Sequence, residues 1–356
     1  MSVFIIAEVG VNHNGSMELA KELIRTASEC GADAVKFQTF RTDKLVTHNA
    51  KKAEYQATND ASSATQAEML RRLELSLEQF VELSQECTKH NVAFMTTCFD
   101  SESLAAICDT ANPDILKIGS GELTNLPFLV DHARTGKPVI ISTGMATLAE
   151  VEDALAALAF GYLTDRGAPE SYRWLKQNYY SAESMDCLRN KVTILHCVTD
   201  YPARPEDLNL DAIRQLHSAF KLDVGYSDHS LGLEACCGAV ALGARCLEKH
   251  ITLDKNLPGP DHAASASPDE FASFVTAIRH LEKALVPRIK APTVREQKTA
   301  EIARRYLVAS QNIAEGELFT EQNLEAKRSS LGISAASYWD LIGTPAPRAL
   351  KAGDNL

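Results

Sequence analysis

The sequence lacks the features that carry a chain into a membrane or out of the cell. No run reaches the roughly 18 consecutive apolar residues that a membrane-spanning helix requires. The apolar N-terminus has no positive flank and no small-residue cleavage site, which predicts a strand rather than a signal peptide. The nine cysteines are odd in number, scattered and without CxxC spacing, which argues against a disulfide framework or a zinc site. We therefore expect a cytoplasmic protein with no membrane partner.

Positive charge is also scarce. Lys and Arg together number 36 and Asp and Glu 47, so the formal net charge is −11. Nucleic acid is not an expected partner, because its phosphates require a basic protein face. An anionic substrate would need a local basic pocket inside an acidic shell. Apolar residues make up 45% of the 356, so the chain can bury a core, and its length suits a large α/β domain with a small second one.

Short apolar runs recur eight times, and each is followed by a longer stretch with apolar residues at helical spacing. The runs are residues 3–10, 34–38, 92–97, 115–120, 139–142, 192–197, 223–227 and 245–250. Continuous apolar runs are typical of parallel strands that are buried on both faces. Eight alternations of strand and helix predict an α/β fold of the (β/α)₈ TIM-barrel type. A doubly wound sheet is the alternative, although it would not require eight strands.

Three segments define the expected domain organisation. We assign residues 1–285 to the barrel, the Pro-containing and basic residues 286–299 to a linker, and residues 300–356 to a small β-rich domain. Within the barrel, residues 40–75 and 161–189 are longer than a strand-to-strand crossover needs. We expect these two segments to be insertions or capping loops.

Polar or charged residues stand at the end of every predicted strand. They are Glu8, Lys36, Gln38, Thr97, Lys117, Ser120, Glu122, Ser142, Thr199, Tyr201, Ser227, Asp228, His229, Glu248 and His250. The carboxyl ends of TIM-barrel strands carry the active site. Packing alone does not explain eight strand ends of the same character, so the sequence predicts a site at this end of the barrel.

Two lysines are the clearest anomalies, because Lys36 and Lys117 lie in apolar strands. A buried ammonium group is costly unless it finds an anion. The structural explanation is an ion pair with Glu8 or Glu122, or a side chain that reaches the mouth of the barrel. Hydroxyl groups follow neighbouring strands, at Ser120, Ser142 and Ser227. The two lysines and these hydroxyls together favour a binding site for phosphate or carboxylate.

His229 and His250 end the last two predicted strands. Adjacent strands lie about 5 Å apart, so both imidazoles can reach one divalent ion such as Mn²⁺, Fe²⁺ or Zn²⁺. Asp228 and Glu248 are candidates to hydrogen-bond the two rings from behind. For either histidine alone, a hydrogen-bonded residue at the barrel mouth is the simpler interpretation. Cys197 is interpreted as a small buried hydrophobic residue rather than a nucleophile.

Several ordered motifs together resemble the sialic acid synthase family, and most closely its bacterial N-acetylneuraminate synthases. They are residues 4–16 (FIIAEVGVNHNGS), 34–40 (AVKFQTF), 117–127 (KIGSGELTNLP), 142–147 (STGMAT), 195–202 (LHCVTDYP), 225–232 (GYSDHSLG) and 247–262 (LEKHITLDKNLPGPDH). The resemblance covers nearly the whole chain. It extends to the small terminal domain, which resembles the antifreeze-like (SAF) domain of that family.

The resemblance implies a metal-dependent condensation of phosphoenolpyruvate (PEP) with an N-acetylated amino sugar. N-acetylmannosamine is the leading acceptor, which would make the product N-acetylneuraminate. A 2,4-diacetamido-trideoxyhexose, which leads to legionaminic acid, is the alternative. In the implied reaction C3 of PEP attacks the sugar aldehyde, which the metal polarises. Water then attacks C2, and phosphate leaves with cleavage of the C–O bond.

The resemblance also implies roles for particular residues. The expected PEP-binding residues are Lys36, Lys117, Ser120, Ser142, Thr199 and Ser227, and Thr97 joins them as a substrate-binding strand end. The expected sugar-facing residues are Glu8, Gln38, Tyr201 and Asp261. Glu122, Glu8 and Lys117 are the expected catalytic groups, with Glu122 handling a proton at the PEP carbon. His229 and His250 are the expected metal ligands, with Mn²⁺ as the ion and Mg²⁺ or Co²⁺ as alternatives.

A domain-swapped homodimer is implied as well, in which Arg328 of the small domain covers the N-acetyl group of the sugar bound in the other subunit. Two other classes of function remain open from the residues themselves. A Schiff-base aldolase would use Lys36 or Lys117 as its nucleophile. A non-enzymatic ice-binding module would use the antifreeze-like domain.

Overall fold

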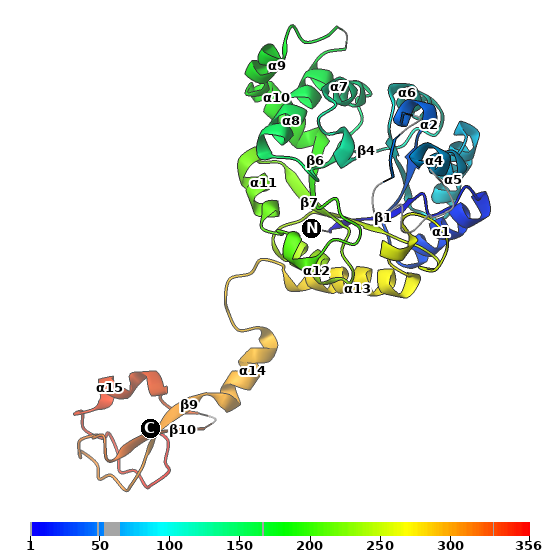
Figure 1. Ribbon diagram of the computed structural model, residues 1–356. Coiled ribbons are helices and arrows are strands. Elements are labelled where there is room, and N and C mark those ends of the chain that lie inside the picture. The colour runs from blue at the N-terminus through cyan, green and yellow to red at the C-terminus, as the bar shows by residue number, and fades with distance from the viewer. Residues whose placement is uncertain (1, 48–49, 53–64, 166, 330) are drawn as a thin grey trace. The chain divides into compact units, whose positions relative to one another are not determined.

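A computed structural model describes residues 2–47, 50–52, 65–165, 167–329 and 331–356. The chain forms two compact units, Met1–Val286 and Pro287–Leu356 (Figure 1). No helix among the described residues is both long and apolar enough to cross a bilayer.

Eight parallel strands close into a barrel in the order of the sequence. They are β1 (Phe4–Gly10), β2 (Ala34–Thr39), β3 (Ala93–Cys98), β4 (Leu116–Ile118), β5 (Val139–Ser142), β6 (Val192–Cys197), β7 (Asp223–Asp228) and β8 (Cys246–His250). β1 pairs with both β2 and β8, so the sheet has no open edge. The predicted TIM barrel is confirmed, and the doubly wound sheet is excluded because such a sheet does not close.

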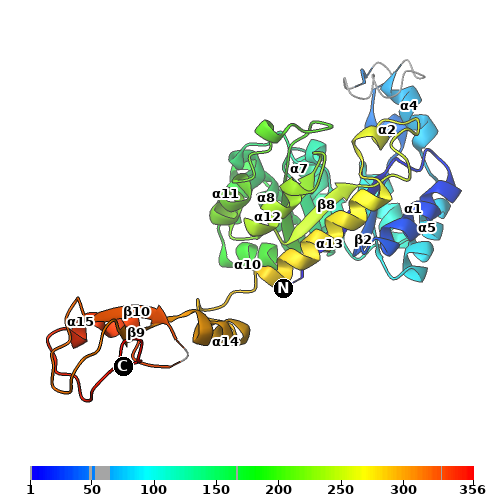
Figure 2. The ribbon, with the colours of Figure 1, turned by 90° about the horizontal axis from the view of Figure 1, so that it is seen from below.

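Helices surround the strands in Figure 1. They are α1 (Met17–Glu29), α2 (Thr42–Leu45), α4 (Gln66–Leu73), α5 (Leu77–Lys89), α6 (Ser101–Thr110), α7 (Leu126–Arg134), α8 (Leu148–Leu163), α9 (Tyr172–Tyr179), α10 (Ala182–Lys191), α11 (Ala212–Phe220), α12 (Glu234–Ala241) and α13 (Pro268–Ala284). Capping boxes at Ser76, Thr147 and Ser267 begin α5, α8 and α13 by satisfying backbone N–H groups of the first turn. α13 closes the ring against α12 and α1 (Figure 2).

The two long crossovers contain helices rather than loops alone. Residues 40–75 include α2 and α4, while positions 48–49 and 53–64 of this segment lie outside the described residues. Residues 161–189 include α9 and most of α10, both of which pack on α8. α9 buries only Leu175 and Tyr179, so its apolar stripe is too short to stand out in the sequence.

The side chains inside the barrel change from apolar to polar toward the carboxyl ends of the strands. Side chains alternate between the barrel interior and the helix side along each strand. The lower interior layer is an apolar cluster of Ile6, Ala34, Met95, Ile140, Leu195 and Cys246. At the next inward-facing level toward the carboxyl ends stand Glu8, Lys36, Thr97, Lys117, Ser142, Cys197, Ser227 and Glu248. The apolar layer therefore forms the floor of a polar chamber.

The second unit is small and built around its own core. β9 (Arg305–Ala309) and β10 (Leu324–Arg328) pair antiparallel, which confirms the β-rich terminal unit. Its buried residues are Leu307, Ala309, Ile313, Phe319, Leu324, Ala346 and Leu350. α14 (Val294–Ala303) begins inside the predicted linker, and none of its residues is buried. α15 (Tyr338–Leu341) is the last helix of the unit.

The interior of the barrel requires a glycine on β7. A methyl group at Gly225 would stand 2.3 Å from the carbonyl oxygen of Cys246 and 2.6 Å from the side chain of Leu195. We expect Gly225→Ala to lower the free energy of unfolding by about 1–3 kcal/mol, because a packed interior must shift to admit it. The measurement is urea denaturation followed by circular dichroism.

Gly121→Ala is the matched control for this stability measurement, because a methyl group there meets nothing within 4 Å. We expect its denaturation midpoint to stay near that of the unmodified chain. An equal loss of stability in the two variants would contradict the close approach of β7 and β8 at Gly225.

Candidate active site

A cavity of about 180 Å³ opens at the carboxyl ends of the strands, and all eight strands contribute to its wall. It brings together the predicted residues Glu8, Lys36, Gln38, Thr97, Lys117, Ser120, Ser142, Thr199, Tyr201, Ser227, His229 and His250. These residues come from segments spread over most of the barrel sequence. Their convergence is the arrangement that the polar strand ends predicted.

Four buried charges form the base of this cavity. The Nζ atom of Lys36 lies 2.6 Å from Oε2 of Glu8 and 3.7 Å from Oε2 of Glu248. The Nζ atom of Lys117 lies 3.8 Å from Oε1 of Glu248. None of the four residues is more than 5% exposed. Two carboxylates therefore balance two ammonium groups inside the barrel, and this is the compensation that buried charge requires.

Burial and pairing act differently on the two carboxyl groups. Burial raises the pKa of Glu8 to about 7, although Lys36 acts to lower it. Burial also acts to raise the pKa of Glu248, but Lys117 and Lys36 outweigh it and hold this pKa at about 2. Burial lowers the pKa of Lys117. Glu248 is thus ionised at neutral pH and is the fixed anion between the two lysines.

Hydroxyl groups gather beside Lys117. Its Nζ atom donates to Oγ of Ser142 at 2.7 Å. The backbone N–H of Gly144 donates to Oγ of Ser120 at 2.9 Å. A methyl group at Gly144 would stand 2.1 Å from Oγ1 of Thr199 and 2.8 Å from Oγ of Ser120. The missing side chain of Gly144 therefore lets the hydroxyls of Thr199 and Ser120 approach one point, and this suits an anion that takes several hydrogen bonds.

The two histidines lie beside this polar group. Their ring centroids are 5.8 Å apart, and the ring of Tyr201 lies 4.1 Å from that of His229. Burial lowers the pKa of both histidines, to about 3 for His250, so both are neutral at pH 7. Nδ1 of His229 donates to the carbonyl oxygen of Val198 at 2.6 Å, because a carbonyl can only accept.

That hydrogen bond leaves the lone pair of His229 on Nε2. The neighbouring hydroxyl of Ser227 stands 3.4 Å from Nε2 but gives its one proton to Oε1 of Glu248 at 2.8 Å. Nδ1 of His250 is buried, and no group among the described residues forms a hydrogen bond with it. Two neutral imidazoles with unused nitrogen lone pairs fit a divalent metal ion. Among the described residues no group of three or more His, Cys, Asp or Glu side chains stands ready to hold a metal, so the chain would supply two ligands.

Three predicted residues stand apart from the cavity wall. Glu122 ends a short 3₁₀ turn and accepts a hydrogen bond from Asn125 at 2.9 Å. Asp261 is buried in the loop after β8, and burial raises its pKa to about 6 against the opposing effect of Lys36. Arg328 is exposed at the end of β10 in the second unit. Their expected roles stay predictions.

The structure adds residues that the sequence analysis did not place in the site. Glu248 was predicted as a polar strand end and as a partner behind a histidine ring, and the structure shows that it lines the cavity between the lysines. The alternation of Glu248 and His250 on β8 was the signal that could have found it. Cys197 and Phe99 also line the wall. Asp228 does not contact a histidine ring; Val198 takes that place at His229.

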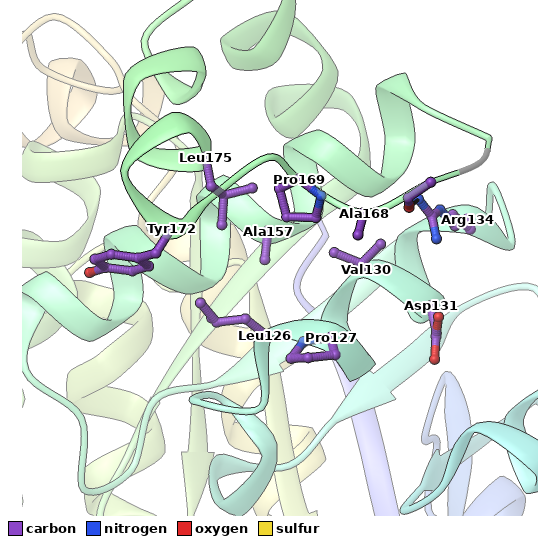
Figure 3. Close-up of a pocket in the computed structure, with 11 residues that line it drawn as sticks. Leu126, Pro127, Val130, Asp131, Arg134, Ala157, Ala168, Pro169, Tyr172 and Leu175 are labelled. Atoms are coloured by element: carbon purple, nitrogen blue, oxygen red, sulfur yellow. Dashed lines mark hydrogen bonds between the residues drawn. The ribbon is translucent and has the colours of Figure 1, made fainter.

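A second cavity, of about 380 Å³, lies on the outside of the barrel (Figure 3). Leu126, Pro127, Val130, Tyr172 and Leu175 contribute mainly apolar surface to it. Arg134, at its edge, donates to the carbonyl oxygens of Thr164 and Gly167. This cavity lacks the buried lysines and hydroxyls of the barrel mouth, so it is not suited to a small anion.

One family of synthases matches the chain over nearly its whole length. The NeuB family model matches residues 23–290, and the SAF domain model matches residues 304–356. The chain is 44% identical to the N,N'-diacetyllegionaminic acid synthase of Campylobacter jejuni, over 98% of this chain and 96% of the relative. It is 40% identical to the enzyme of that name from Legionella pneumophila, over 100% and 94%.

Comparison with solved structures agrees with this family assignment. The N-acetylneuraminic acid synthetase of Leptospira borgpetersenii, in complex with citrate, superposes with a TM-score of 0.68 at 32% identity. The match covers 85% of this chain and 91% of that one.

Removal of the charge on Glu248 should expose the role of the buried network. We expect Glu248→Gln to destabilise the fold by about 3–5 kcal/mol, because it leaves two buried lysines with a single carboxylate. PEP should then raise the melting temperature of the variant by more than it raises that of the unmodified chain, because the ligand supplies the missing anion. Thermal unfolding with and without PEP measures both effects.

Glu102→Gln is the matched control. Glu102 also stands between two cations, at 2.9 Å from Arg41 and 2.8 Å from Lys44, but on the surface. We expect little change in its melting temperature, because exposed pairs are screened by solvent. A PEP response that is the same in both variants would contradict the assignment of the lysines to the anion.

Proposed function

Because the chain belongs to the NeuB family, we propose that it condenses PEP with a 2,4-diacetamido-trideoxyhexose to form N,N'-diacetyllegionaminic acid and phosphate. The observation that carries the condensation is the pair of buried lysines beside converging hydroxyls at the barrel mouth. Identities of 44% and 40% to two legionaminic acid synthases support the acceptor sugar. N-acetylmannosamine, which the motifs alone put first, becomes the second candidate, supported by the 32% identity to the sialic acid synthetase.

The basic groups of the cavity suit the phosphate and carboxylate of PEP. Lys36 and Lys117 supply two positive charges, and Ser120, Ser142 and Thr199 supply hydrogen bonds. All are held in place before the substrate arrives, so stabilisation of the developing negative charge needs no reorganisation. When the anion binds, it would take over part of the pairing that Glu248 otherwise provides to the lysines.

The sugar would occupy the side of the cavity that holds Glu8, Gln38 and Tyr201. Nε2 of Gln38 donates to Oε1 of Glu8 at 3.4 Å, so both side chains face the same space. Phe99 places an apolar surface in this otherwise polar wall. A trideoxy sugar has a methyl group where N-acetylmannosamine has a hydroxymethyl group, and an aromatic wall suits the methyl group.

Proton transfer needs a group near the reacting carbons of PEP. Glu122 remains our candidate, because it directly follows Ser120 and Gly121, which line the cavity. His229 and His250 would hold Mn²⁺, with Mg²⁺ or Co²⁺ as alternatives. When bound there, the ion would supply Lewis-acid polarisation of the sugar aldehyde.

We further propose that the protein is a domain-swapped homodimer in which Arg328 covers the sugar in the other subunit. Arg328 is exposed on its own small unit. Val294 and Ile302 expose apolar side chains on α14, and no residue of this helix is buried in the single chain. The two exposed apolar side chains on this otherwise polar helix support a surface that another chain covers.

A panel of acceptor sugars tests the proposed reaction. We expect PEP-dependent phosphate release to have a kcat/KM at least about tenfold higher with a 2,4-diacetamido-trideoxyhexose than with N-acetylmannosamine. N-acetylglucosamine serves as the unreactive control. Faster turnover of N-acetylmannosamine would overturn the choice of sugar, whereas borohydride trapping of substrate on Lys117 without phosphate release would overturn the condensation itself.

Mixing two inactive variants tests the domain swap. Arg328→Ala and His250→Ala, dissociated and reassembled together, should recover about a quarter of the parental activity, because half the dimers are mixed and each has one complete site. Each variant taken through the same procedure alone should stay inactive. If differently tagged subunits are shown to exchange and no activity returns, Arg328 does not serve the other subunit.

A further inference from the structure

A buried ion pair lies behind the two histidines, on the helix side of the barrel wall. Asp228 is 2% exposed and Lys249 is 5% exposed. Nζ of Lys249 donates to Oδ2 of Asp228 at 2.6 Å. The two residues are register partners on β7 and β8. Each immediately precedes a histidine, so the pair joins the two backbone segments from which the imidazoles project.

The ion pair also fixes the residue that follows His229. The carboxylate of Asp228 accepts from the backbone N–H of Ser230 at 2.9 Å and from its hydroxyl at 2.6 Å. Lys249 donates to the carbonyl oxygen of Ser230 at 2.9 Å. His229 therefore sits between two residues that are tied to one buried network. Its own carbonyl accepts from the N–H of Ala203 at 2.9 Å, so its backbone is held from both sides.

The alternation of side chains explains why the network faces away from the cavity. Lys249 points to the helix side because Glu248 and His250, its neighbours on β8, line the barrel interior. Tyr226 and Cys236 complete the outer network by donating to Asp228 at 3.3 and 3.2 Å. The pair does not line the cavity, and among the described residues no hydrogen bond joins it to a histidine ring, so it holds the rings in place through the backbone.

Stability alone does not account for this ion pair. At the ends of three other strands the helix-side positions are apolar, at Phe37, Ile118 and Ile141. Thr39, Thr96 and His196 are polar helix-side residues, but they form hydrogen bonds and no ion pair among the described residues. Buried ion pairs are often no more stabilising than apolar residues of similar volume. The charged pair occurs where two neighbouring strands both end in a histidine. Its location indicates a requirement for defined geometry at this place.

We infer that Asp228 and Lys249 are positioning residues that fix the separation of the His229 and His250 imidazoles and so set the affinity for a divalent ion. This inference rests on the proposed role of the two histidines as metal ligands. Groups behind metal ligands commonly change metal affinity by about 10–100-fold when they are replaced. Here the effect would pass through the backbone of the strand ends, and not through a hydrogen bond to either ring.

Lys249→Met tests the inference, because it removes the charge and keeps an unbranched side chain. The carboxylate of Asp228 keeps its donors from Ser230 and Tyr226, so it is not left without partners. Arg279→Met is the matched control. Arg279 pairs with Asp33 at 2.7 Å, just before β2 and at the opposite end of the barrel from the histidines. Both variants lose a buried or half-buried cation that joins distant segments.

Two measurements on the full chain report the geometry directly. Calorimetric titration with Mn²⁺ after treatment with a chelator gives the metal affinity without turnover. Spectra of ¹⁵N-labelled histidine rings without metal report the surroundings of His229 and His250. We expect Lys249→Met to weaken Mn²⁺ binding about 10–100-fold and to shift both ring signals, while Arg279→Met changes neither.

The outcomes separate the inference from the proposed function. Unchanged Mn²⁺ affinity and unchanged ring signals in Lys249→Met would overturn the positioning role. If the unmodified chain binds no Mn²⁺, the metal assignment fails. In that case unchanged ring signals in Lys249→Met would overturn the positioning role as well. If Lys249→Met does not fold, Ser230→Ala is the second variant, because it removes one hydrogen bond to Asp228. Unchanged histidine ring signals in Ser230→Ala would then overturn the inference.

Discussion

The charge balance inside the barrel is the constraint on which the site depends. Lys36 and Lys117 are buried beside the carboxyl groups of Glu8 and Glu248, which compensate their charge within the same chamber. This arrangement needs an apolar floor below it, since water entering from the other end would screen the charges. It also needs all eight strands to close, because the four residues come from four different strands. Both the stability of the barrel and the proposed anion binding therefore require compensated charges at these inward-facing positions.

The same network connects the anion site to the histidines. The carboxylate of Glu248 accepts the hydrogen bond of the Ser227 hydroxyl. Without Glu248, that hydroxyl could donate to Nε2 of His229 instead. The carboxylate thus serves both lysines and also keeps an imidazole lone pair available. A ligand that displaces Glu248 from the lysines would act on the surroundings of His229 as well. Binding of the anion and preparation of the histidine pair are physically coupled in this geometry.

Most of the fold could be predicted from the sequence, because each barrel strand is a continuous apolar run and the runs number eight. The lysines, hydroxyls and histidines could be found because each is anomalous at a strand end. Glu248 was found as a polar strand end, but its place between the two lysines was not predicted, because that place follows from alternation within one strand and not from an anomaly. The expected role of Asp228 was wrong because it precedes His229 and so faces the other side of the wall. Helices α9 and α10 were not predicted because they bury few residues.

The identity of the sugar is the property that sequence patterns resolve least, and the structure shows why. Many charged and hydroxyl groups converge from the strands at the proposed anion site, so the signal for it is large and repeated along the chain. A methyl group in place of a hydroxymethyl group changes binding by only about 1–3 kcal/mol and involves few contacts. In the proposed reaction, residues such as Phe99 would carry the choice of acceptor on a barrel whose anion site would be common to either choice. For this reason overall identity to relatives of known specificity discriminates between acceptors better than the motifs do.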